Sequence, residues 1–218
     1  NEGKMPDDGL YYPKNELADF YWIKKDEPEE AADVIERMMT DRIPARFGFD
    51  PKNDIQLITP MNRGVCGTVA MNERLQSIVN ADSKLAFSCA GRTFRIGDRV
   101  MQTSNNYDKG VFNGDMGRIM MIRHSDSEFV VRFDATDVTY AFDDAEQLML
   151  AYAVTIHKSQ GSEFPVVIMP ILSQHYMMLQ RNLLYTGMTR AKKLMILVGS
   201  RKAVSMAVRN AVREPRHS

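Results

Sequence analysis

Apolar and polar residues follow two different periods along this chain, and the change of period divides the chain into three parts. In the outer parts, short apolar runs alternate with segments that carry apolar residues at helical spacing. In the middle part, from about residue 88 to residue 147, short runs alternate with turn residues and no long helical pattern occurs. The pattern predicts an α/β fold, a parallel sheet with helices on both faces, interrupted by a small all-β insertion.

Five short apolar runs outside the middle part predict the strands of the parallel sheet. They are rich in β-branched or aromatic residues and are bounded by polar or turn-forming residues. The five runs are Asp19–Lys24, Ile55–Thr59, Leu148–Val154, Val166–Met169 and Leu194–Val198. Residues 1–17 contain glycine and proline with little periodicity, and they are interpreted as a linker or tail.

Helical spacing occurs in four segments between and after these strands. The first helix starts near Pro28 and is expected to end near Asp41, because Pro44 cannot continue it. The other three helices are expected at about residues 64–79, with Met71, Leu75 and Ile78 on one face, at 175–189, and at 201–213, with Val204, Ala207, Val208 and Ala211 facing inward.

The middle part carries about five short strands separated by tight turns. Asn113-Gly114 is a strong hairpin signal. Strands of this length and density predict a small barrel. The predicted strands are Thr93–Ile96, Arg99–Thr103, Gly117–Arg123, Phe129–Phe133 and Val138–Phe142. We therefore expect one domain made of residues 18–87 and 148–218, with a barrel at residues 88–147 inserted into it.

Composition narrows the class of protein. The 218 residues have a formal net charge of zero, so any contact with nucleic acid must come from a local surface. Two cysteines suggest neither a disulfide framework nor a metal cluster, and a reducing cytoplasm is the simplest interpretation. No apolar run approaches the roughly 18 residues of a membrane span. The polar N-terminus does not look like a secretory signal.

A dense polar loop lies between the third and fourth predicted strands. It combines the hydroxyls of Thr155 and Ser159 with the imidazole of His157. Hydroxyls and backbone N–H groups at a strand end suit phosphate oxygens, and Gly161 lets the backbone approach a ligand or take a positive φ. Glu163 is an acceptor and suits a sugar hydroxyl better than a phosphate. An ordinary polar turn is an equally good interpretation of the composition alone.

Two arginines occupy positions from which a guanidinium could reach a phosphate. Arg190 lies between a predicted helix and a strand, where it could act as an arginine finger on a γ-phosphate. The alternative is favourable placement of cations at a helix C-terminus, which Lys192 and Lys193 share, and the residues alone favour it. Arg63 follows a strand and precedes a helix, and it has the same two interpretations.

The phosphate-binding motif that nucleotide motors need does not occur in the sequence. No G-x-x-x-x-G-K-[ST] is present, and the glycine-rich stretch Gly64–Thr68 has the wrong spacing and no lysine. The acidic stretch Asp143–Gln147 follows no buried apolar strand and is interpreted as a solvated turn rather than a magnesium site. If the chain handles ATP, it supplies only part of the site.

Five stretches in a fixed order carry a family resemblance. They are Leu57–Gly64, Gly97–Gln102, Val111–Gly117, Thr155–Phe164 and Leu184–Lys192. Together they resemble motif IV, the opening of an inserted SH3-like barrel, motif V and motif VI of superfamily 1 DNA helicases of the RecD type, the exodeoxyribonuclease V alpha-subunit family. The likeness covers about residues 20–200 and implies a RecA-like second motor domain. A Pif1-like helicase shares His-Lys-Ser-Gln-Gly, but Ser-Glu-Phe and Tyr-Thr-Gly-Met-Thr-Arg fit the RecD type better.

The resemblance implies a role for each candidate residue. Arg190 would be the arginine finger, and Arg63 a second contact to the γ-phosphate. Glu163 would face the ribose, with Gly161 allowing the close approach. The residues implied as contacts to the phosphates of a single DNA strand are Thr155, His157 and Ser159. The resemblance also implies ATP with Mg²⁺ as cofactor and 5′→3′ movement along DNA in repair and recombination.

The resemblance includes only half of a motor, because the family's first motor domain has no counterpart here. The chain is therefore expected to be part of a longer protein, to hydrolyse ATP negligibly alone, and to rely on the first domain to hold the metal. Expected partners are single-stranded DNA, the P-loop domain of the same polypeptide and subunits of a nuclease complex, with no membrane.

Two other hypotheses stay open for the sequence alone. The first is a stand-alone, non-enzymatic adaptor that binds single-stranded nucleic acid. The second is a protein-interaction module, which predicts no DNA affinity at any salt concentration. In the barrel, Tyr107, Lys109 and Phe112 could guide a strand, but barrel packing and solvation is the favoured interpretation of these three.

Overall fold

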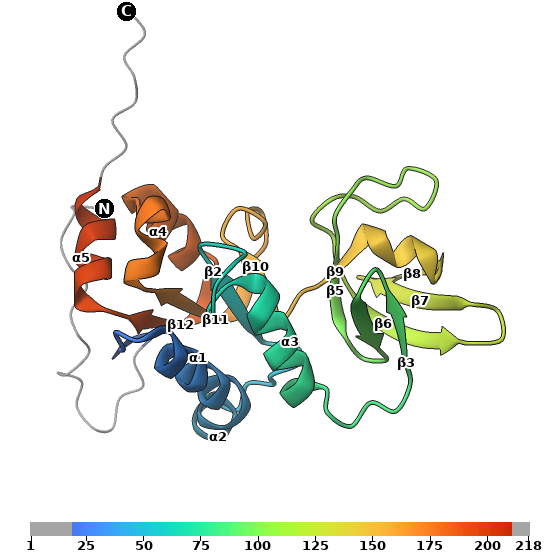
Figure 1. The fold of residues 1–218 in the computed structure, drawn as a ribbon, viewed down its shortest axis with the longest axis horizontal. Coiled ribbons are helices and arrows are strands. Elements are labelled where there is room, and N and C mark those ends of the chain that lie inside the picture. Colours follow the sequence, from blue (N-terminus) through green and yellow to red (C-terminus); the bar gives the residue numbers. More distant parts are fainter. Residues whose placement is uncertain (1–18, 211–218) are drawn as a thin grey trace, which may run out of the picture. The chain divides into compact units, whose positions relative to one another are not determined.

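A computed structural model describes residues 19–210 of the chain, and they divide into two compact units (Figure 1). Unit 1 consists of the described residues up to Met71 and from Ala153 onward, and unit 2 consists of Asn72–Tyr152. Both divisions differ from the boundaries expected at residues 87–88 and 147–148. The linker or tail expected at residues 1–17 and the inward-facing Ala211 lie outside the described residues.

Unit 1 is built on five parallel strands, as the sequence predicted. Their order across the sheet is β1-β12-β11-β2-β10. The strands are β1 (Phe20–Lys24), β2 (Ile55–Thr59), β10 (Ala153–Thr155), β11 (Phe164–Ile171) and β12 (Ala191–Gly199). All five residues of β2 are buried, as are six consecutive residues of β12, which explains why these strands are continuous apolar runs. The carboxyl ends of β2 and β10 lie side by side, since Thr155 is paired with Thr59.

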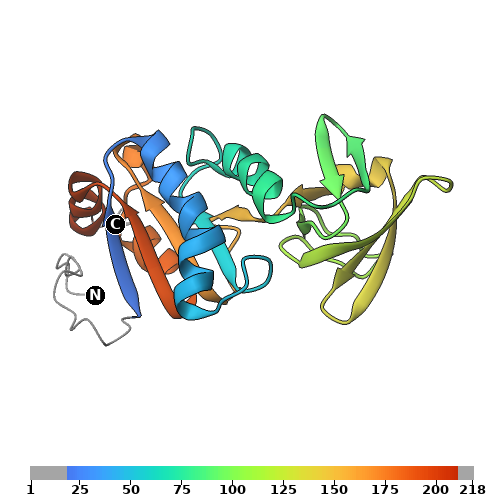
Figure 2. The same cartoon turned by 90° about the horizontal axis from the view of Figure 1, so that it is seen from below.

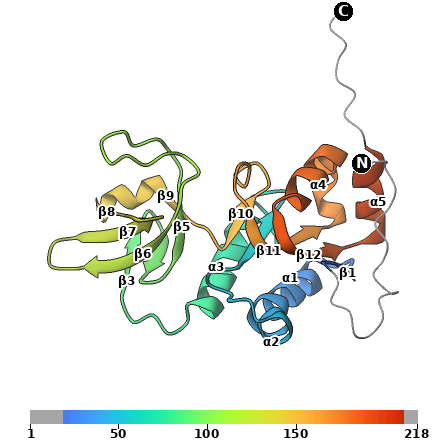
Figure 3. The ribbon, with the colours of Figure 1, turned by 180° about the vertical axis from the view of Figure 1, so that it is seen from behind.

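Helices cover both faces of this sheet, which confirms the predicted fold class (Figures 1, 2 and 3). On one face lie α1 (Pro28–Arg37) and α2 (Ile43–Phe47), and on the other lie α4 (Arg181–Met188) and α5 (Arg201–Arg209). The single helix expected at residues 175–189 was wrong, because a 3-10 helix at Ser173–Met178 precedes α4. The break is set by tertiary contact: Arg181 donates its backbone N–H to Asn210 (2.9 Å) and its side-chain Nε–H to the Val208 carbonyl (2.9 Å).

The first helix does not stop near Asp41, as Pro44 had led us to expect. A π-helical turn at Met38–Arg42 joins α1 to α2, and the helical column continues to Phe47. The wider turn lets the N–H of Ile43 reach back to Met38, so Pro44 falls in the first turn of α2. Proline is tolerated there, because its missing N–H is one that a helix start leaves unpaired.

Unit 2 is an antiparallel β unit. Its five-stranded sheet has the order β8-β7-β6-β5-β9, and a separate hairpin joins β3 to β4. The strands are β3 (Ala86–Cys89), β4 (Arg92–Arg95), β5 (Arg99–Gln102), β6 (Met116–Arg123), β7 (Glu128–Phe133), β8 (Thr136–Ala141) and β9 (Leu148–Leu150). Asn113-Gly114 forms a turn with Gly114 at φ +100°, but it lies within the long β5–β6 connection rather than at a two-residue hairpin.

The apolar run Leu148–Val154 is not one strand but two. Its first half is β9, which pairs antiparallel with β5 in unit 2. Its second half contributes to β10, which pairs parallel with β2 in unit 1. Ala151, between them, donates its N–H to the Arg99 carbonyl (2.8 Å). An apolar run cannot reveal which sheet each half joins, so the sequence placed this boundary too early.

Helix α3 (Thr68–Val79) begins later than the expected Gly64, because residues 64–67 form a turn closed by the Gly67 N–H and the Gly64 carbonyl (2.9 Å). Met71 and Leu75 are buried as predicted, but Ile78 is 41% exposed and Val79 takes its place. A second buried stripe is polar, which the apolar pattern could not show. It consists of Asn72 and Gln76 in the helix and Asn80 just after it.

Two residues of that stripe, Gln76 and Asn80, donate hydrogen bonds to a fully buried carboxylate, Asp98. One oxygen of Asp98 accepts hydrogen bonds from Asn80 Nδ2 (2.8 Å) and the Tyr152 hydroxyl (2.9 Å). The other accepts from Gln76 Nε2 (2.6 Å) and the backbone N–H of Arg95 (2.7 Å). Burial, together with the adjacent Asp98 charge, holds the pKa of Tyr152 well above its usual range, so this hydroxyl stays a donor.

We predict that Asp98→Asn destabilises unit 2 by about 3 kcal/mol, because an amide nitrogen would face buried donors that need an acceptor. Urea unfolding of the 218-residue chain measures the loss, and hydrogen exchange should place it within residues 72–152. The matched control is Asp137→Asn, which removes an ion pair with Arg132 on the exposed face and should have little effect. Equal unfolding midpoints for the two variants would contradict the role of Asp98.

Candidate functional site

The polar loop between β10 and β11 folds into a tight turn that uses its own polar groups. The N–H of Ser159 donates to the Thr155 carbonyl (3.0 Å), and the N–H of Ser162 donates to the Ser159 carbonyl (3.1 Å). The Ser159 hydroxyl donates to the Ile156 carbonyl (2.8 Å), and Thr155 Oγ1 accepts from the Lys158 N–H (3.3 Å). The loop therefore fixes much of its own shape before any ligand is present.

Of the three residues predicted to contact DNA phosphates, His157 alone has an exposed side chain. Thr155 is 9% exposed and Ser159 is fully buried. Their hydroxyls take part in the turn, so a phosphate at this loop would meet the His157 ring and backbone groups first. DNA contact by any of the three stays a prediction.

Arg190 bridges the end of α4 and the polar loop. Its Nε donates to the Thr186 carbonyl (3.1 Å), its Nη1 to the Ser162 carbonyl (3.2 Å) and its Nη2 to Thr189 Oγ1 (3.1 Å). Its own carbonyl accepts the N–H of Phe164, the first residue of β11 (2.8 Å). Within the described residues, three of the five N–H donors of a guanidinium are engaged in this way.

Glu163 and Gly161 lie near Arg190, at the amino edge of the sheet where β11 and β12 begin. Glu163 is exposed and forms an ion pair with Lys192 (3.1 Å) at the start of β12. Gly161 adopts φ +84°, with no atom within 4 Å of where a Cβ would stand. Glycine is therefore required for the backbone conformation rather than for space. The structure thus brings the predicted nucleotide-facing residues together.

Arg63 is placed at the other end of the strands. It follows the carboxyl end of β2 and is exposed. The next residue, Gly64, lies beside Gln174, which follows the carboxyl end of β11 (a Cβ on Gly64 would be 3.6 Å from Gln174 Oε1). The eight residues of β11 separate this edge from Arg190. The structure does not bring Arg63 and Arg190 together, and their shared contact to a γ-phosphate stays a prediction.

His175 is a structural residue that the sequence did not single out. His175 is 1% exposed. Its ring Nδ1 accepts the backbone N–H of Leu172 (3.1 Å), and its backbone N–H donates to the Leu172 carbonyl (2.9 Å). Burial lowers the pKa of His175 to about 4. The ring is thus neutral near pH 7, with its proton on Nε2, because Nδ1 is an acceptor.

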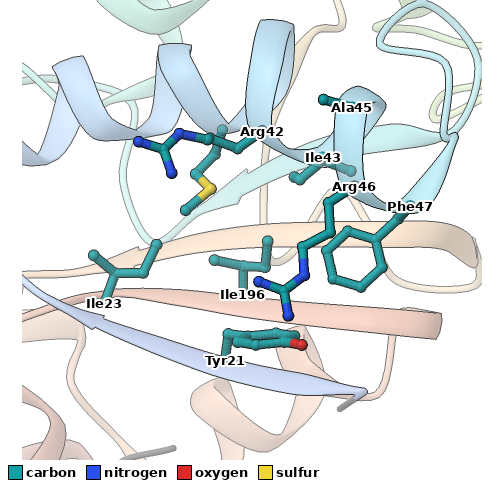
Figure 4. A pocket seen from close by; sticks show the side chains of 9 residues that line it. Tyr21, Ile23, Arg42, Ile43, Ala45, Arg46, Phe47 and Ile196 are labelled. Carbon is teal, nitrogen blue, oxygen red and sulfur yellow. The ribbon is translucent and has the colours of Figure 1, made fainter. Parts of the chain in front are cut away.

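A cavity of about 310 Å³ opens between α2 and the β1–β12 edge of the sheet (Figure 4). The Arg46 guanidinium lies over the rings of Tyr21 (5.9 Å) and Phe47 (5.8 Å) at this cavity. Its lining consists of Tyr21, Ile23, Met38, Arg42, Ile43, Ala45, Arg46, Phe47 and Ile196. It includes none of the predicted site residues.

The three barrel residues singled out in the sequence behave differently from one another. The Lys109 ammonium donates to the Thr139 carbonyl (2.7 Å) and lies over the Tyr140 ring, so it helps to hold the sheet. Tyr107 is 77% exposed and Phe112 is 46% exposed. Of the favoured interpretation, barrel packing and solvation, packing thus describes Lys109, whereas solvation describes these two rings.

Between residues 19 and 210, no helix is both long and apolar enough to cross a membrane. No group of three or more His, Cys, Asp or Glu side chains is arranged there to hold a metal ion.

Comparison with known proteins gives two family matches. Residues 150–198 match the model of the UvrD-like helicase C-terminal domain, and residues 71–133 match that of the ATP-dependent RecD-like DNA helicase SH3 domain. The first range contains the polar loop and Arg190, whereas Arg63 lies outside both.

Curated relatives agree with these matches. The chain is 35% identical to the ATP-dependent RecD2 DNA helicase of Deinococcus radiodurans, over 70% of this chain and 21% of that protein. It is 29% identical to the RecBCD enzyme subunit RecD of Mycolicibacterium smegmatis, over 88% of this chain and 35% of that protein. The chain thus spans about a fifth to a third of the length of these relatives.

Among solved structures, the fold is similar to that of Pif1 helicase from Bacteroides in complex with ADP-AlF3 and ssDNA. The TM-score is 0.52 at 21% identity, over 84% of this chain and 47% of that one. A second Bacteroides Pif1 structure, bound to ssDNA, gives a TM-score of 0.51 at 21% identity, over 73% and 43% of the two chains.

The fold and the two domain matches define the C-terminal region of a superfamily 1 helicase. Within that class the chain belongs to the RecD-like helicases, as the motifs in the sequence had indicated. The adaptor hypothesis is not favoured by these findings.

We predict that His175 makes unit 1 less stable in mild acid. Between its ordinary pKa of 6.5 and the folded value of about 4, the unfolded chain binds a proton that the folded chain does not. Its contribution is therefore complete above pH 6.5 and falls toward pH 4, by at most about 3 kcal/mol. Unfolding measured at several pH values should show this fall. His175→Asn, which keeps an acceptor, should remove it, whereas the exposed His157→Asn should not. The same acid slope in all three proteins would contradict the prediction.

Proposed function

We propose that this chain supplies the second motor domain of an ATP-dependent DNA helicase that moves 5′→3′ along single-stranded DNA. The observation that carries the proposal is the bridge made by Arg190 between α4 and the polar loop, beside Glu163. It joins a candidate nucleotide sensor to a loop whose other end carries the candidate DNA contact His157. The ATP-dependent relatives and the ssDNA-bound Pif1 structures support this assignment.

Arg190 is proposed as the arginine finger. Its two remaining N–H groups can approach a γ-phosphate that a P-loop domain of the same polypeptide holds, and a planar guanidinium matches phosphate oxygens. Moving toward the phosphate would weaken its bonds to Ser162 and Thr189. The loop would then lose one of its fixed points when the nucleotide binds and regain it after release.

Glu163 is proposed to accept a hydrogen bond from the ribose of ATP. Because Lys192 now occupies this carboxylate, the ribose has to compete with an ion pair that is about half exposed and therefore weak. Mg²⁺ is proposed to be held by the P-loop domain. Arg63 could act as the second phosphate contact only if another part of the polypeptide brings the nucleotide to the carboxyl edge of the sheet.

The charge distribution supports contact of unit 1 with a phosphate backbone. Residues 153–210 contain eight Lys and Arg and a single acidic residue, Glu163. This segment includes the polar loop, α4 and the start of β12. A DNA strand held here by its phosphates should bind more weakly as salt rises. Subunits of a nuclease complex are proposed as further partners, by analogy with the RecBCD subunits among the relatives.

We expect the purified 218-residue chain to hydrolyse ATP negligibly, with or without single-stranded DNA, because no P-loop occurs in its sequence. A coupled assay of phosphate release measures this. Adding the chain covalently to a P-loop motor domain of a RecD-like relative should restore DNA-stimulated hydrolysis. DNA-stimulated turnover by the 218-residue chain itself would overturn the assignment.

In a polypeptide that also contains the P-loop domain, Arg190→Ala should lower kcat for ATP by at least about 1,000-fold. Affinity for single-stranded DNA should change far less than kcat, because the hydrogen bonds of Thr155 and Ser159 still hold the end of the loop that carries His157. Arg201→Ala, an exposed cation at the start of α5, is the matched control and should leave hydrolysis unchanged. A parallel loss of DNA affinity in Arg190→Ala would count against a finger.

A further inference from the structure

Unit 2 presents two aromatic rings to solvent on one connection, between β5 and β6. Tyr107 is 77% exposed and Phe112 is 46% exposed. Their ring centroids are 6.0 Å apart and the planes are inclined by 76°, an edge-to-face pair. The pair leaves much of the Tyr107 ring open to solvent. Because the two rings touch, they form one contiguous apolar surface, and contiguous exposed apolar surface is a common feature of interaction sites.

The connection that carries the rings is held in one shape by hydrogen bonds. Asn106 and Val111 exchange backbone N–H to carbonyl bonds of 2.8 and 3.1 Å. Asn105 Nδ2 donates to the Tyr107 hydroxyl (3.3 Å), and Asn105 Oδ1 accepts the N–H of Asn113 (3.0 Å). The rings are thus oriented before a ligand arrives, which lowers the entropic cost of binding.

Two side chains fasten this connection to the rest of unit 2. Asn106 Nδ2 donates to Gln147 Oε1 (3.0 Å), and the Lys109 ammonium donates to the Thr139 carbonyl (2.7 Å). Lys109 is therefore turned toward the sheet and not toward the two rings. The nearest cation in the sequence is part of the support and does not form a phosphate site beside Tyr107 and Phe112.

The size of the patch decides between two kinds of partner. A stable protein interface buries roughly 800 Å² on each side around an apolar centre. Here polar residues flank the two rings along the chain, and one or two stacked bases would cover them. The flanking residues are Ser104, Asn105, Asp108 and Asn113. The patch therefore fits flat nucleobases better than a protein surface.

Charge decides how a nucleic acid would be held here. Unit 2 contains nine Lys and Arg against twelve Asp and Glu, so its net charge is negative. A phosphate backbone would gain little from such a surface. A base can stack on an aromatic ring whatever its sequence, with a gain of about 1–3 kcal/mol per base.

We propose that Tyr107 and Phe112 form a base-stacking platform for single-stranded nucleic acid. The platform holds bases, whereas the basic segment of unit 1 holds phosphates. This inference rests on the proposed function, because it takes single-stranded DNA as the ligand. Base stacking on unit 2 would be a second kind of contact, beside the phosphate contacts of unit 1. It does not require a positive charge on unit 2.

The test compares two fluorescein-labelled oligodeoxythymidines of about 12 nucleotides, one complete and one with abasic sites replacing its central bases. Fluorescence anisotropy gives Kd for each oligonucleotide over a range of salt concentrations. The 218-residue chain should bind the complete oligonucleotide more tightly. The double variant Tyr107→Ala/Phe112→Ala should bind it about tenfold more weakly and lose its preference over the abasic one. The dependence of Kd on salt should stay the same, because no phosphate contact is removed.

Three single variants refine the result. Tyr107→Phe keeps a ring and should keep most of the affinity, whereas Tyr107→Leu is apolar without a ring and should lose it. Leu85→Ala removes another exposed apolar side chain of unit 2 (46% exposed) and is the matched control. Circular dichroism and urea unfolding of each variant separate a lost contact from a lost fold.

The outcomes distinguish the platform from the function on which it rests. Equal Kd values for the double variant and the unaltered chain, with salt-dependent binding in both, would overturn the platform and leave the proposed function standing. Equal Kd values are also the result expected if Tyr107 and Phe112 contact a protein partner instead of bases. Failure of the unaltered chain to bind either oligonucleotide, even at low salt, would overturn both.

Discussion

The carboxylate of Asp98 is the interaction on which unit 2 depends most. It is removed from water and receives four donors, which is the condition under which a buried charge can be retained. One donor is Gln76 in α3, and a second is Asn80, just after this helix. The third is the hydroxyl of Tyr152, the last residue of the unit, and the fourth is the backbone N–H of Arg95 at the end of β4. Asp98 thus joins early residues of the unit, its last residue and the β3–β4 hairpin.

In unit 1 the corresponding constraint is the polar loop, whose groups largely satisfy one another. Ser159 and Thr155 stabilise its turn, and Arg190 holds its far end through the Ser162 carbonyl. In the proposed function, a nucleotide that engages Arg190 would have to replace hydrogen bonds that already exist. The net gain would therefore be smaller than that of the bare phosphate contact, because part of it would go into releasing the loop. Lys192 places a similar, weaker competitor on Glu163.

Most of the fold could be predicted from the sequence where one physical signal dominates. The buried strands β2, β11 and β12 are apolar runs, and the polar loop with Arg190 follows a recognisable order of motifs. Predictions failed where tertiary contacts decided the outcome. Pro44 is accommodated by a π-helical turn, and the polar Gln76 and Asn80 are buried in place of Ile78 because they donate to Asp98.

The candidate site shows the same limit. A motif gives the order of residues along the chain but not which end of a strand each one occupies. For this reason Arg63 was grouped with Arg190, although the strands separate them. Nor does composition reveal that the Ser159 hydroxyl is turned inward or that the Tyr107 ring is turned outward. Those outcomes depend on individual hydrogen bonds, such as the one from Asn105 to the Tyr107 hydroxyl.

The shared acceptor of Asn80 and Tyr152 has a consequence for how unit 2 is connected to unit 1. Both side chains donate to the same oxygen of Asp98, so the turn that follows α3 and the last residue of unit 2 meet at one carboxylate. Bringing the two ends of an inserted segment together costs conformational entropy. The contacts within unit 2 offset this entropy. The contact at Asp98 brings early and late residues of unit 2 together, so the segment adds little closure cost to the pairing of β2 and β10, the two strands of unit 1 that it separates in the chain.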